Sequence, residues 1–238
     1  MIRVTIWNEN VHDKEDFIKA IYPNGLHGRL KEIIEQLQDV EVRIATLDQP
    51  ECGLTDDVLD NTDVMLWWGH MAHNEVPDET ARKVRDRVLQ GMGFIGLHSA
   101  HDSKPFKLLM GTSCSLSWRE SDFERMWTIL PGHPIAKGIP DYFELNTEEM
   151  YGERFDIPQP DELVFAGWFS GGELMRSGCC WNRGAGKVFY FQPGHESFKS
   201  FYNQYVEQII RNAVLWAAPN CPPQSLCCRP IEKPMKNN

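Results

Sequence analysis

Short apolar runs alternate with amphipathic stretches, and this alternation constrains the fold more than any other feature of the sequence. Runs rich in β-branched and aromatic residues predict buried strands at Ile2–Trp7, Val40–Thr46, Asp63–Trp68 and Gly93–His98. Stretches with helical spacing of apolar residues lie between them, from Leu26 to Leu37 and from Asp78 to Gln90, and a further helix is expected from Lys104. Strands that are joined through helices pair in parallel by right-handed crossovers. Because the runs that end at Trp68 and His98 are almost unbroken in apolar residues, we expect helices to cover both faces of the sheet.

The pattern changes after Arg119. Short strand-like runs interrupted by Gly and Pro follow, at Trp127–Leu130, Leu163–Phe169, Glu173–Arg176 and Lys187–Gln192. We interpret these runs as extra strands that extend the same sheet, and Tyr202–Ala217 as a closing helix. The sequence therefore predicts one α/β domain over residues 1–218, with a mostly parallel sheet and extra late strands, and a loose tail with Pro and Cys over residues 219–238.

Charge and composition indicate which kinds of partner and which cellular compartment to expect. The chain has 24 Lys and Arg against 34 Asp and Glu, a net charge of −10, which disfavours nucleic acid as a partner. No apolar run reaches the ~20 residues of a membrane span, and the first residues lack the features of a signal peptide. The seven cysteines follow no disulfide framework. We therefore expect a cytoplasmic protein with reduced thiols.

Histidines gather directly after the predicted strands. Six of the eight lie there: His12 after the first strand, His70 and His73 after the third, His98 and His101 after the fourth, and His195 after the last. In an open parallel sheet, ligands bind beyond the carboxyl ends of the strands, where these side chains would meet. A single histidine is more often a surface or satisfied core residue, but the whole set predicts a functional site.

Two kinds of chemistry fit such a site. Neutral imidazoles of His70, His98 and His195 come from three strand ends and could hold zinc or another divalent metal. Alternatively, a histidine could transfer protons without a metal, oriented by Glu196 or Glu149. In either case we predict that His98, His195 and Glu196 form the catalytic centre. The sequence has no dinucleotide fingerprint, so neither a nicotinamide nor a flavin cofactor is expected.

The turn over residues 96–100 is similar to a nucleophile elbow, in which a sharp turn after a strand exposes one side chain. The apex position falls on His98, and Ser99 lies one residue beyond it. A nucleophilic Ser99 or Cys114 would make the protein a hydrolase. For Cys114, however, packing as a small buried hydrophobe is the more frequent role.

Aromatic and charged side chains that suit a sugar pocket follow several of the strands. Rings stack on the C–H faces of sugars, while polar groups bind the hydroxyls. The predicted substrate-binding residues are His73, His101, Trp118, Arg119, Glu120, Glu149 and Tyr151. Trp67 and Trp168 are instead expected in the core.

Several long strings make the chain similar to the trehalose-utilisation (ThuA-like) family from about Ile2 to Ala217, among them WWGHMAHNEVPDE, GMGFIGLHSAHDSKPFKLLMGTSCSLSWRE, EEMYGERFDIP and RGAGKVFYFQPGHES. The resemblance implies a flavodoxin-like three-layer α/β/α sandwich of the class I glutamine amidotransferase-like superfamily. Those amidotransferases have a Cys at the elbow, where this chain has His98. After the last strand they have a His and, two residues further on, a Glu, whereas His195 and Glu196 are adjacent in this chain. Because imidazole cannot form the thioester of glutamine hydrolysis, glutaminase activity is not expected.

The resemblance also implies a role in using trehalose or related disaccharides, acting on a sugar or keto-sugar. We expect an enzyme of hydrolase or isomerase type that works by His/Glu acid–base or metal-assisted chemistry. A partner dehydrogenase would supply any redox step, and the exposed late strands make a homodimer plausible. The alternative is a non-catalytic sugar-binding or assembly module, because a fold does not fix a function.

Overall fold

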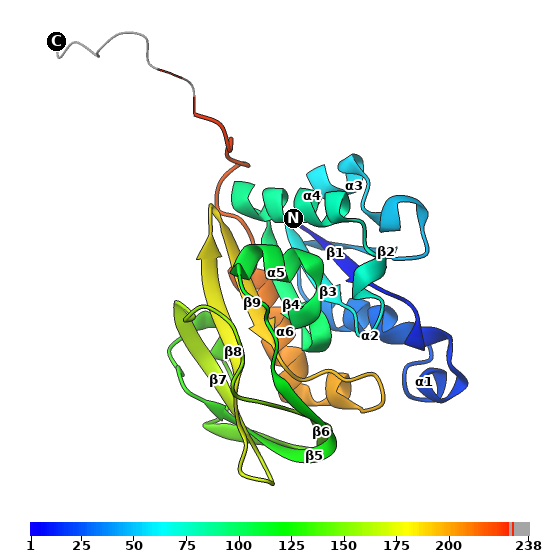
Figure 1. The fold of residues 1–238 in the computed structure, drawn as a ribbon, viewed down its shortest axis with the longest axis vertical. Coiled ribbons are helices and arrows are strands. Elements are labelled where there is room, and N and C mark those ends of the chain that lie inside the picture. Colours follow the sequence, from blue (N-terminus) through cyan, green and yellow to red (C-terminus); the bar gives the residue numbers. More distant parts are fainter. Residues whose placement is uncertain (229, 231–238) are drawn as a thin grey trace, which may run out of the picture.

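The computed structural model describes residues 1–228 and residue 230. Within these residues, nine strands form one mixed sheet in the order β2-β1-β3-β4-β9-β8-β7-β5-β6 (Figure 1). The parallel half consists of β1 (Ile2–Asn8), β2 (Val40–Thr46), β3 (Val64–Trp68), β4 (Gly93–Leu97) and β9 (Gly186–Phe191). The first four are the runs from which a parallel sheet was predicted, whereas β9 was predicted only as one of the extra late strands. Each strand ends within two residues of its expected position.

The antiparallel half extends the same sheet beyond β9. It consists of β8 (Leu174–Arg183), β7 (Glu162–Phe169), β5 (Ser117–Thr128) and β6 (Tyr142–Gly152). Two of these strands are much longer than the predicted runs, and β6 was not predicted as a strand. Most side chains of β5 are exposed or half-buried, and β6 is the last strand of the sheet. Such strands have no continuous apolar run to reveal them.

Helices cover both faces of the parallel half of the sheet, as predicted. One apolar core contains side chains of α1 (Asp16–Ile21), α2 (Gly25–Ile34) and α6 (Gln204–Ala217). The other contains side chains of α3 (Asp56–Asp60), α4 (Asp78–Gln90) and α5 (Lys104–Met110). Along β3, Leu66 and Trp68 enter the first core while Met65 and Trp67 enter the second. The result is a three-layer α/β/α sandwich of flavodoxin-like type.

Two tryptophans expected in the core differ in their burial. Trp67 is fully buried and stacks on Trp7 with ring centroids 3.8 Å apart, as predicted. Trp168 is only half-buried and lies edge-on against Phe123 in the antiparallel half, so the core expectation for Trp168 was wrong. The residue is on a strand of the antiparallel extension, where helices do not cover both faces (Figure 1).

Local capping sets the start of the closing helix. The Asn203 side chain accepts hydrogen bonds from the backbone N–H groups of Tyr205 and Val206, so α6 begins at Gln204 instead of at the predicted Tyr202. A glycine ends the helix that precedes β4. Helix α4 is followed by Gly91, whose φ of 133° favours glycine. The connection from this glycine to the start of β4 is therefore short.

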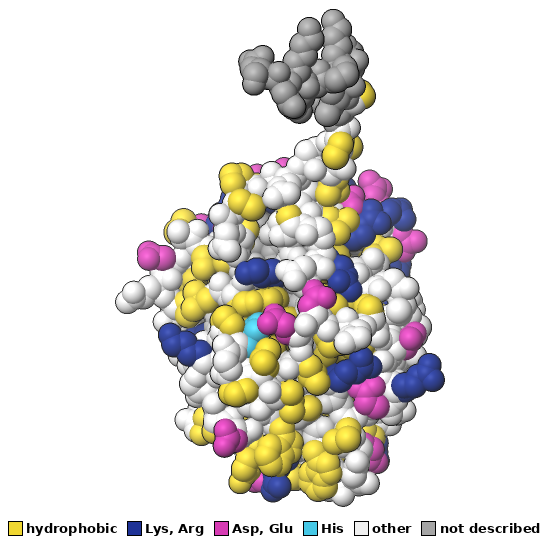
Figure 2. All heavy atoms as spheres, turned by 90° about the vertical axis from the view of Figure 1, so that its left-hand side faces the viewer, with side chains coloured by type: hydrophobic (Ala, Val, Ile, Leu, Met, Phe, Trp, Pro, Cys, Tyr) yellow, Lys and Arg dark blue, Asp and Glu magenta, His cyan; other side chains and the backbone are white. Residues whose placement is uncertain are grey.

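The antiparallel half exposes several large hydrophobic side chains, among them Trp118, Trp127, Tyr142 and Leu174. Figure 2 faces this half and shows hydrophobic side chains gathered at its lower end. No helix in the described part of the chain has the length and apolar character needed to cross a membrane. Residues 219–228 form neither helix nor strand, and the rest of the predicted tail, apart from residue 230, lies outside the described residues.

Candidate functional site

The loops after the parallel strands bring four potential ligand residues together. One nitrogen each from His70, His98 and His195 and a carboxylate oxygen of Glu149 all lie within 4.8 Å of one another. The histidines follow β3, β4 and β9, which are consecutive neighbours in the sheet. Glu149 reaches the same place from β6. The structure thus brings together the three histidines predicted as metal ligands and adds Glu149, which was predicted to bind substrate or to orient a histidine but not to bind a metal.

His98 occupies the apex of the turn after β4. Its φ of 53° lies in the left-handed region, which is strained for a residue with a Cβ and typical of functional turns. The backbone carbonyl of Gln192 accepts a hydrogen bond from His98 Nδ1 at 3.0 Å, and the Tyr190 hydroxyl donates to the His98 carbonyl at 2.9 Å. The ring is fully buried. Its neighbours therefore hold it in one orientation.

His98 and Glu149 form a buried ion pair. Nε2 of His98 lies 3.0 Å from Oε2 of Glu149. Burial opposes both charges, but the pair outweighs it, so the pKa of His98 is raised and the pKa of Glu149 is lowered. The Tyr151 ring stacks on His98, with its hydroxyl 3.3 Å from the same nitrogen. A proton or a cation at this nitrogen is therefore stabilised by the surrounding carboxylates.

Glu196 orients His70 and not its sequence neighbour His195. The carboxylate accepts a hydrogen bond from His70 Nδ1 at 3.0 Å, while His195 Nε2 lies 3.7 Å from it. His12 Nδ1 lies 3.4 Å from Oε1 of the same carboxylate. Burial works against ionisation of Glu196, but the bond from His70 and the nearby histidines lower its pKa to about 2. Glu196 is thus a fixed negative charge at the back of the site.

His195 has one partner and one free nitrogen. Its Nδ1 accepts a hydrogen bond from the backbone N–H of Ser197 at 3.1 Å. Its Nε2 is buried and has no hydrogen-bond partner within the described residues. Burial and the neighbouring His98 lower the pKa of His195 to about 4, so the ring is neutral near pH 7. A buried polar atom without a partner is rare and indicates a place for a ligand, water or ion.

Glu148 builds the loop that carries His195 and Glu196, and sequence reasoning missed it. This fully buried carboxylate accepts from the backbone N–H groups of Glu149 (2.9 Å), Gly194 (3.0 Å) and His195 (3.3 Å), and from the hydroxyl of Ser200. Burial raises its pKa against these favourable bonds. The only sign of Glu148 in the sequence was that it is adjacent to a second acid, Glu149. Successive residues of a regular strand point to opposite faces, so two adjacent buried acids were not expected.

Two other predicted histidines lie at the periphery. His101 Nδ1 donates to the carbonyl of Cys114 at 2.8 Å, and burial lowers the pKa of His101 to about 4. His73 is buried, and burial also lowers its pKa. Neither belongs to the cluster of ligand atoms within the described residues.

The two potential nucleophiles lack the surroundings of an active one. Ser99 Oγ is hydrogen-bonded to the Tyr151 hydroxyl at 2.7 Å and not to a histidine that could act as its base. Burial raises the pKa of the Cys114 thiol to about 11, so the thiol stays protonated near pH 7. The geometry therefore gives no support to a Ser99 or Cys114 hydrolase.

A pocket of about 320 Å³ opens onto the cluster. Its lining includes His70, Glu149, Tyr151, Trp118 and Glu120. Trp118 is 63% exposed at this pocket, a position from which an indole can stack on a sugar ring. Its lining also includes the predicted residue His101.

Arg119 is not brought to this pocket. Its guanidinium group is bound to Glu173 at 2.6 Å and to Asp122 on the exposed surface of the antiparallel half. On a strand, Arg119 points to the face opposite to that of its neighbours Trp118 and Glu120, both of which line the pocket. The predicted group of three adjacent residues is therefore divided between two faces.

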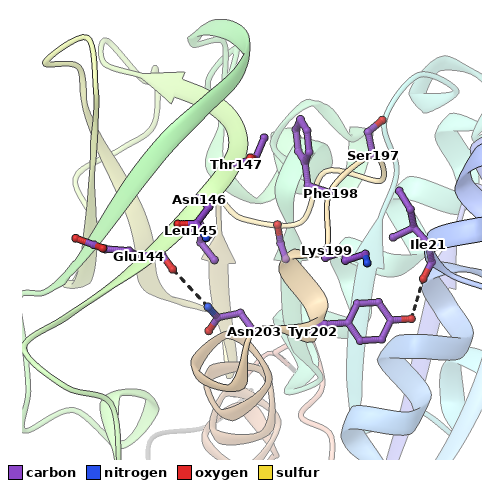
Figure 3. Close-up of a pocket in the computed structure, with 11 residues that line it drawn as sticks. Ile21, Glu144, Leu145, Asn146, Thr147, Ser197, Phe198, Lys199, Tyr202 and Asn203 are labelled. Atoms are coloured by element: carbon purple, nitrogen blue, oxygen red, sulfur yellow. Dashed lines mark hydrogen bonds between the residues drawn. The ribbon is translucent and has the colours of Figure 1, made fainter.

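A larger cavity, of about 500 Å³, lies behind the His195 loop and contains none of the clustered residues. It is lined by β6 residues such as Glu144 and Asn146 and by the segment from Ser197 to Asn203 (Figure 3). In Figure 3 Asn203 donates to the Glu144 carbonyl and Tyr202 to the Ile21 carbonyl, which ties this segment to both sides. None of the clustered residues His70, His98, Glu149 and His195 lines this cavity.

Comparison with known proteins agrees with this architecture. The family model described as ThuA, trehalose utilisation, matches residues 3–217. A ThuA-like protein of Parabacteroides merdae shares 15% identity over 94% of this chain and 92% of its own, with a TM-score of 0.68. A cytoplasmic protein of Salmonella typhimurium shares 13% identity over 92% of this chain and 100% of its own, with a TM-score of 0.61. A glutamine amidotransferase of Thermotoga maritima shares 10% identity over 90% of this chain and 96% of its own, with a TM-score of 0.50.

These structural likenesses show a shared fold of the glutamine amidotransferase type. No curated protein matches the sequence. Because the family model matches most of the length of the sequence, from the first strand to the closing helix, the chain belongs to the ThuA (trehalose utilisation) family.

Proposed function

We propose that this protein is an enzyme of disaccharide utilisation that acts on a sugar or keto-sugar with the help of a divalent metal such as zinc. The family supports a role in sugar utilisation. The observation that carries the catalytic part is the group of His70, His98, Glu149 and His195, whose ligand atoms lie within 4.8 Å of one another. Histidine and carboxylate ligands suit zinc and similar ions.

The surroundings of the cluster fit a bound cation. Glu149 Oε2 is buried without a hydrogen-bond partner in the described structure, and a cation would engage such an atom. His195 Nε2 is equally buried and unpartnered there, which leaves room for a ligand atom beside the cation. When bound, a divalent metal polarises an oxygen of the substrate. Glu196 orients His70, and Trp118 lies where it would stack on the sugar. Glutaminase chemistry is excluded from the proposal because imidazole replaces the thiol at the elbow.

Three further expectations remain part of this proposal. A partner dehydrogenase would supply the keto-sugar, since the sequence carries no cofactor motif of its own. Exposed hydrophobic side chains of the antiparallel half, such as Trp127 and Tyr142, favour a homodimer. The seven free cysteines suit the reducing cytoplasm.

The test combines metal content with turnover. Protein purified without an affinity tag is analysed by plasma mass spectrometry and screened against trehalose-type disaccharides and their keto derivatives. We expect about one divalent ion per chain and turnover of a keto-sugar, both lost in His98→Ala. Turnover without metal would indicate acid–base chemistry by the His98–Glu149 pair, and sugar binding without turnover would favour the non-catalytic module.

A further inference from the structure

The hydrogen bonds around the cluster assign different roles to its three histidines. Each imidazole has two nitrogens, and a neutral ring carries a proton on only one of them. The partner of one nitrogen therefore determines whether the other offers a lone pair to a metal or a proton to a ligand. All three rings have one nitrogen engaged by a group whose role is fixed.

His98 and His70 each have a nitrogen that can bind a metal. The Gln192 carbonyl can only accept, so Nδ1 of His98 carries a proton and Nε2, which faces Glu149, is the nitrogen that remains for a metal. The ionised Glu196 likewise accepts from Nδ1 of His70, which leaves Nε2 of His70 with its lone pair. A carboxylate or a carbonyl behind a metal-binding histidine is the usual arrangement in proteins.

Glu149 completes this set. Its Oε2 lies 3.0 Å from His98 Nε2, yet this oxygen makes no hydrogen bond of acceptable geometry within the described residues. Two atoms at this distance without a directed hydrogen bond are placed as two ligands of one ion would be. Two histidines and one glutamate are a ligand set that leaves a position open for substrate.

His195 differs from the other two. A backbone N–H can only donate, so Nδ1 of His195 keeps its lone pair for Ser197, and the neutral ring carries its proton on Nε2. That Nε2–H is buried and unpartnered, beside the other three residues. Binding a metal through Nε2 would require loss of this proton or displacement of the Ser197 bond. Glu148 opposes such a displacement because it holds the amides of Gly194 and His195.

We propose that His70 Nε2, His98 Nε2 and Glu149 bind the metal, and that His195 stays outside the coordination sphere and donates its Nε2–H to an oxygen of the sugar substrate. This assignment rests on the function proposed above. A donor that is fixed before the substrate arrives stabilises negative charge developing on that oxygen. His195 is then a catalytic residue of a different kind from the two metal ligands.

Zinc titration of the metal-free protein, followed by calorimetry, tests the ligand set. We expect one site in the parent, at least a hundredfold weaker binding in His98→Ala and Glu149→Gln, and a change below about threefold in His195→Leu. His133→Gln is the matched control, because His133 is a buried histidine paired with Glu162 elsewhere in the chain, and its zinc affinity should equal that of the parent. Zinc loss in His195→Leu equal to that in His98→Ala would overturn the assignment, as would absence of zinc binding by the parent.

A second measurement needs no variant. Long-range ¹H–¹⁵N spectra of the ¹⁵N-labelled metal-free parent distinguish protonated from unprotonated ring nitrogens. We expect a protonated Nε2 and an unprotonated Nδ1 for His195, and a protonated Nδ1 for His98. The opposite tautomer of His195 would refute the proposal.

Turnover then separates the inference from the proposed function. Once a substrate is found, kcat should fall about a hundredfold or more in His195→Leu, the usual effect of removing one such donor, and recover in part in His195→Gln, whose amide can still donate. Zinc binding and tautomers as expected, with no sugar turned over, would refute the function and leave the ligand assignment standing. Unchanged kcat in His195→Leu would refute the donor role.

Discussion

Replacing Glu148 by Gln should destabilise the protein, and the hydrogen bonds of this residue allow the size to be worked out. Oε1 accepts from the amides of Glu149 and His195, and Oε2 accepts from the amide of Gly194 and the Ser200 hydroxyl. In Glu148→Gln one oxygen becomes an NH₂ group. The less costly orientation puts it at Oε2, because the hydroxyl can rotate and accept while the Gly194 amide cannot.

The Gly194 amide is then a buried donor without a partner, at a cost of about 1–3 kcal/mol. The two remaining bonds change from charge-assisted to neutral, which weakens each by roughly 1 kcal/mol. Loss of the buried charge, which faces a second carboxylate at Glu124, offsets about 1 kcal/mol of this. We expect the free energy of unfolding to fall by about 2–4 kcal/mol.

Urea denaturation of the parent and of Glu148→Gln at neutral pH measures this difference, with the slope m checked for equality. Ser200→Ala is the control, since it removes one donor and leaves the carboxylate with three, and it should cost roughly 1 kcal/mol. A Glu148→Gln protein within about 0.5 kcal/mol of the parent, the range of ordinary surface substitutions, would refute the reasoning that this carboxylate holds the His195 loop.

Three further predictions concern stability and binding. Gly93→Ala should lower the free energy of unfolding by about 1–3 kcal/mol in urea denaturation, because a Cβ there would lie 2.5 Å from the Ala217 carbonyl oxygen; an unchanged midpoint would contradict this close approach. Trp118→Ala should leave stability within about 0.5 kcal/mol, since the indole is 63% exposed, but should raise KM for the sugar; an unchanged KM would remove Trp118 from the binding site. Burial and Glu148 raise the pKa of Glu124 well above its ordinary value, so its protonated form favours the fold at low pH and this stability is lost as pH rises through the folded-state pKa. Glu124→Gln should therefore flatten the decline in unfolding free energy as pH rises above the ordinary carboxyl pKa, and an unchanged slope would show that Glu124 does not titrate in this way.

The parallel half of the fold and the meeting of the histidines could be predicted from the sequence. Buried strands such as Val64–Trp68 and Gly93–Leu97 require uninterrupted apolar residues, and their helices require apolar residues at helical spacing, so both leave a pattern in the chain. A parallel sheet then directs His70, His98 and His195 to one edge, because residues that follow its strands all emerge at the carboxyl ends.

The fourth member of the cluster and the partner of each imidazole were decided only by the tertiary structure. The middle of β6 is the polar run Asn146–Glu149, so neither the strand nor the convergence of Glu149 with His98 had a local signal. Glu196 is hydrogen-bonded to His70 and not to the adjacent His195, and this choice depends on how two loops fold against each other. Sequence patterns record whether a residue prefers water or the core over a few neighbouring positions. Which hydrogen-bond donor meets which acceptor is set by packing between segments far apart in the chain.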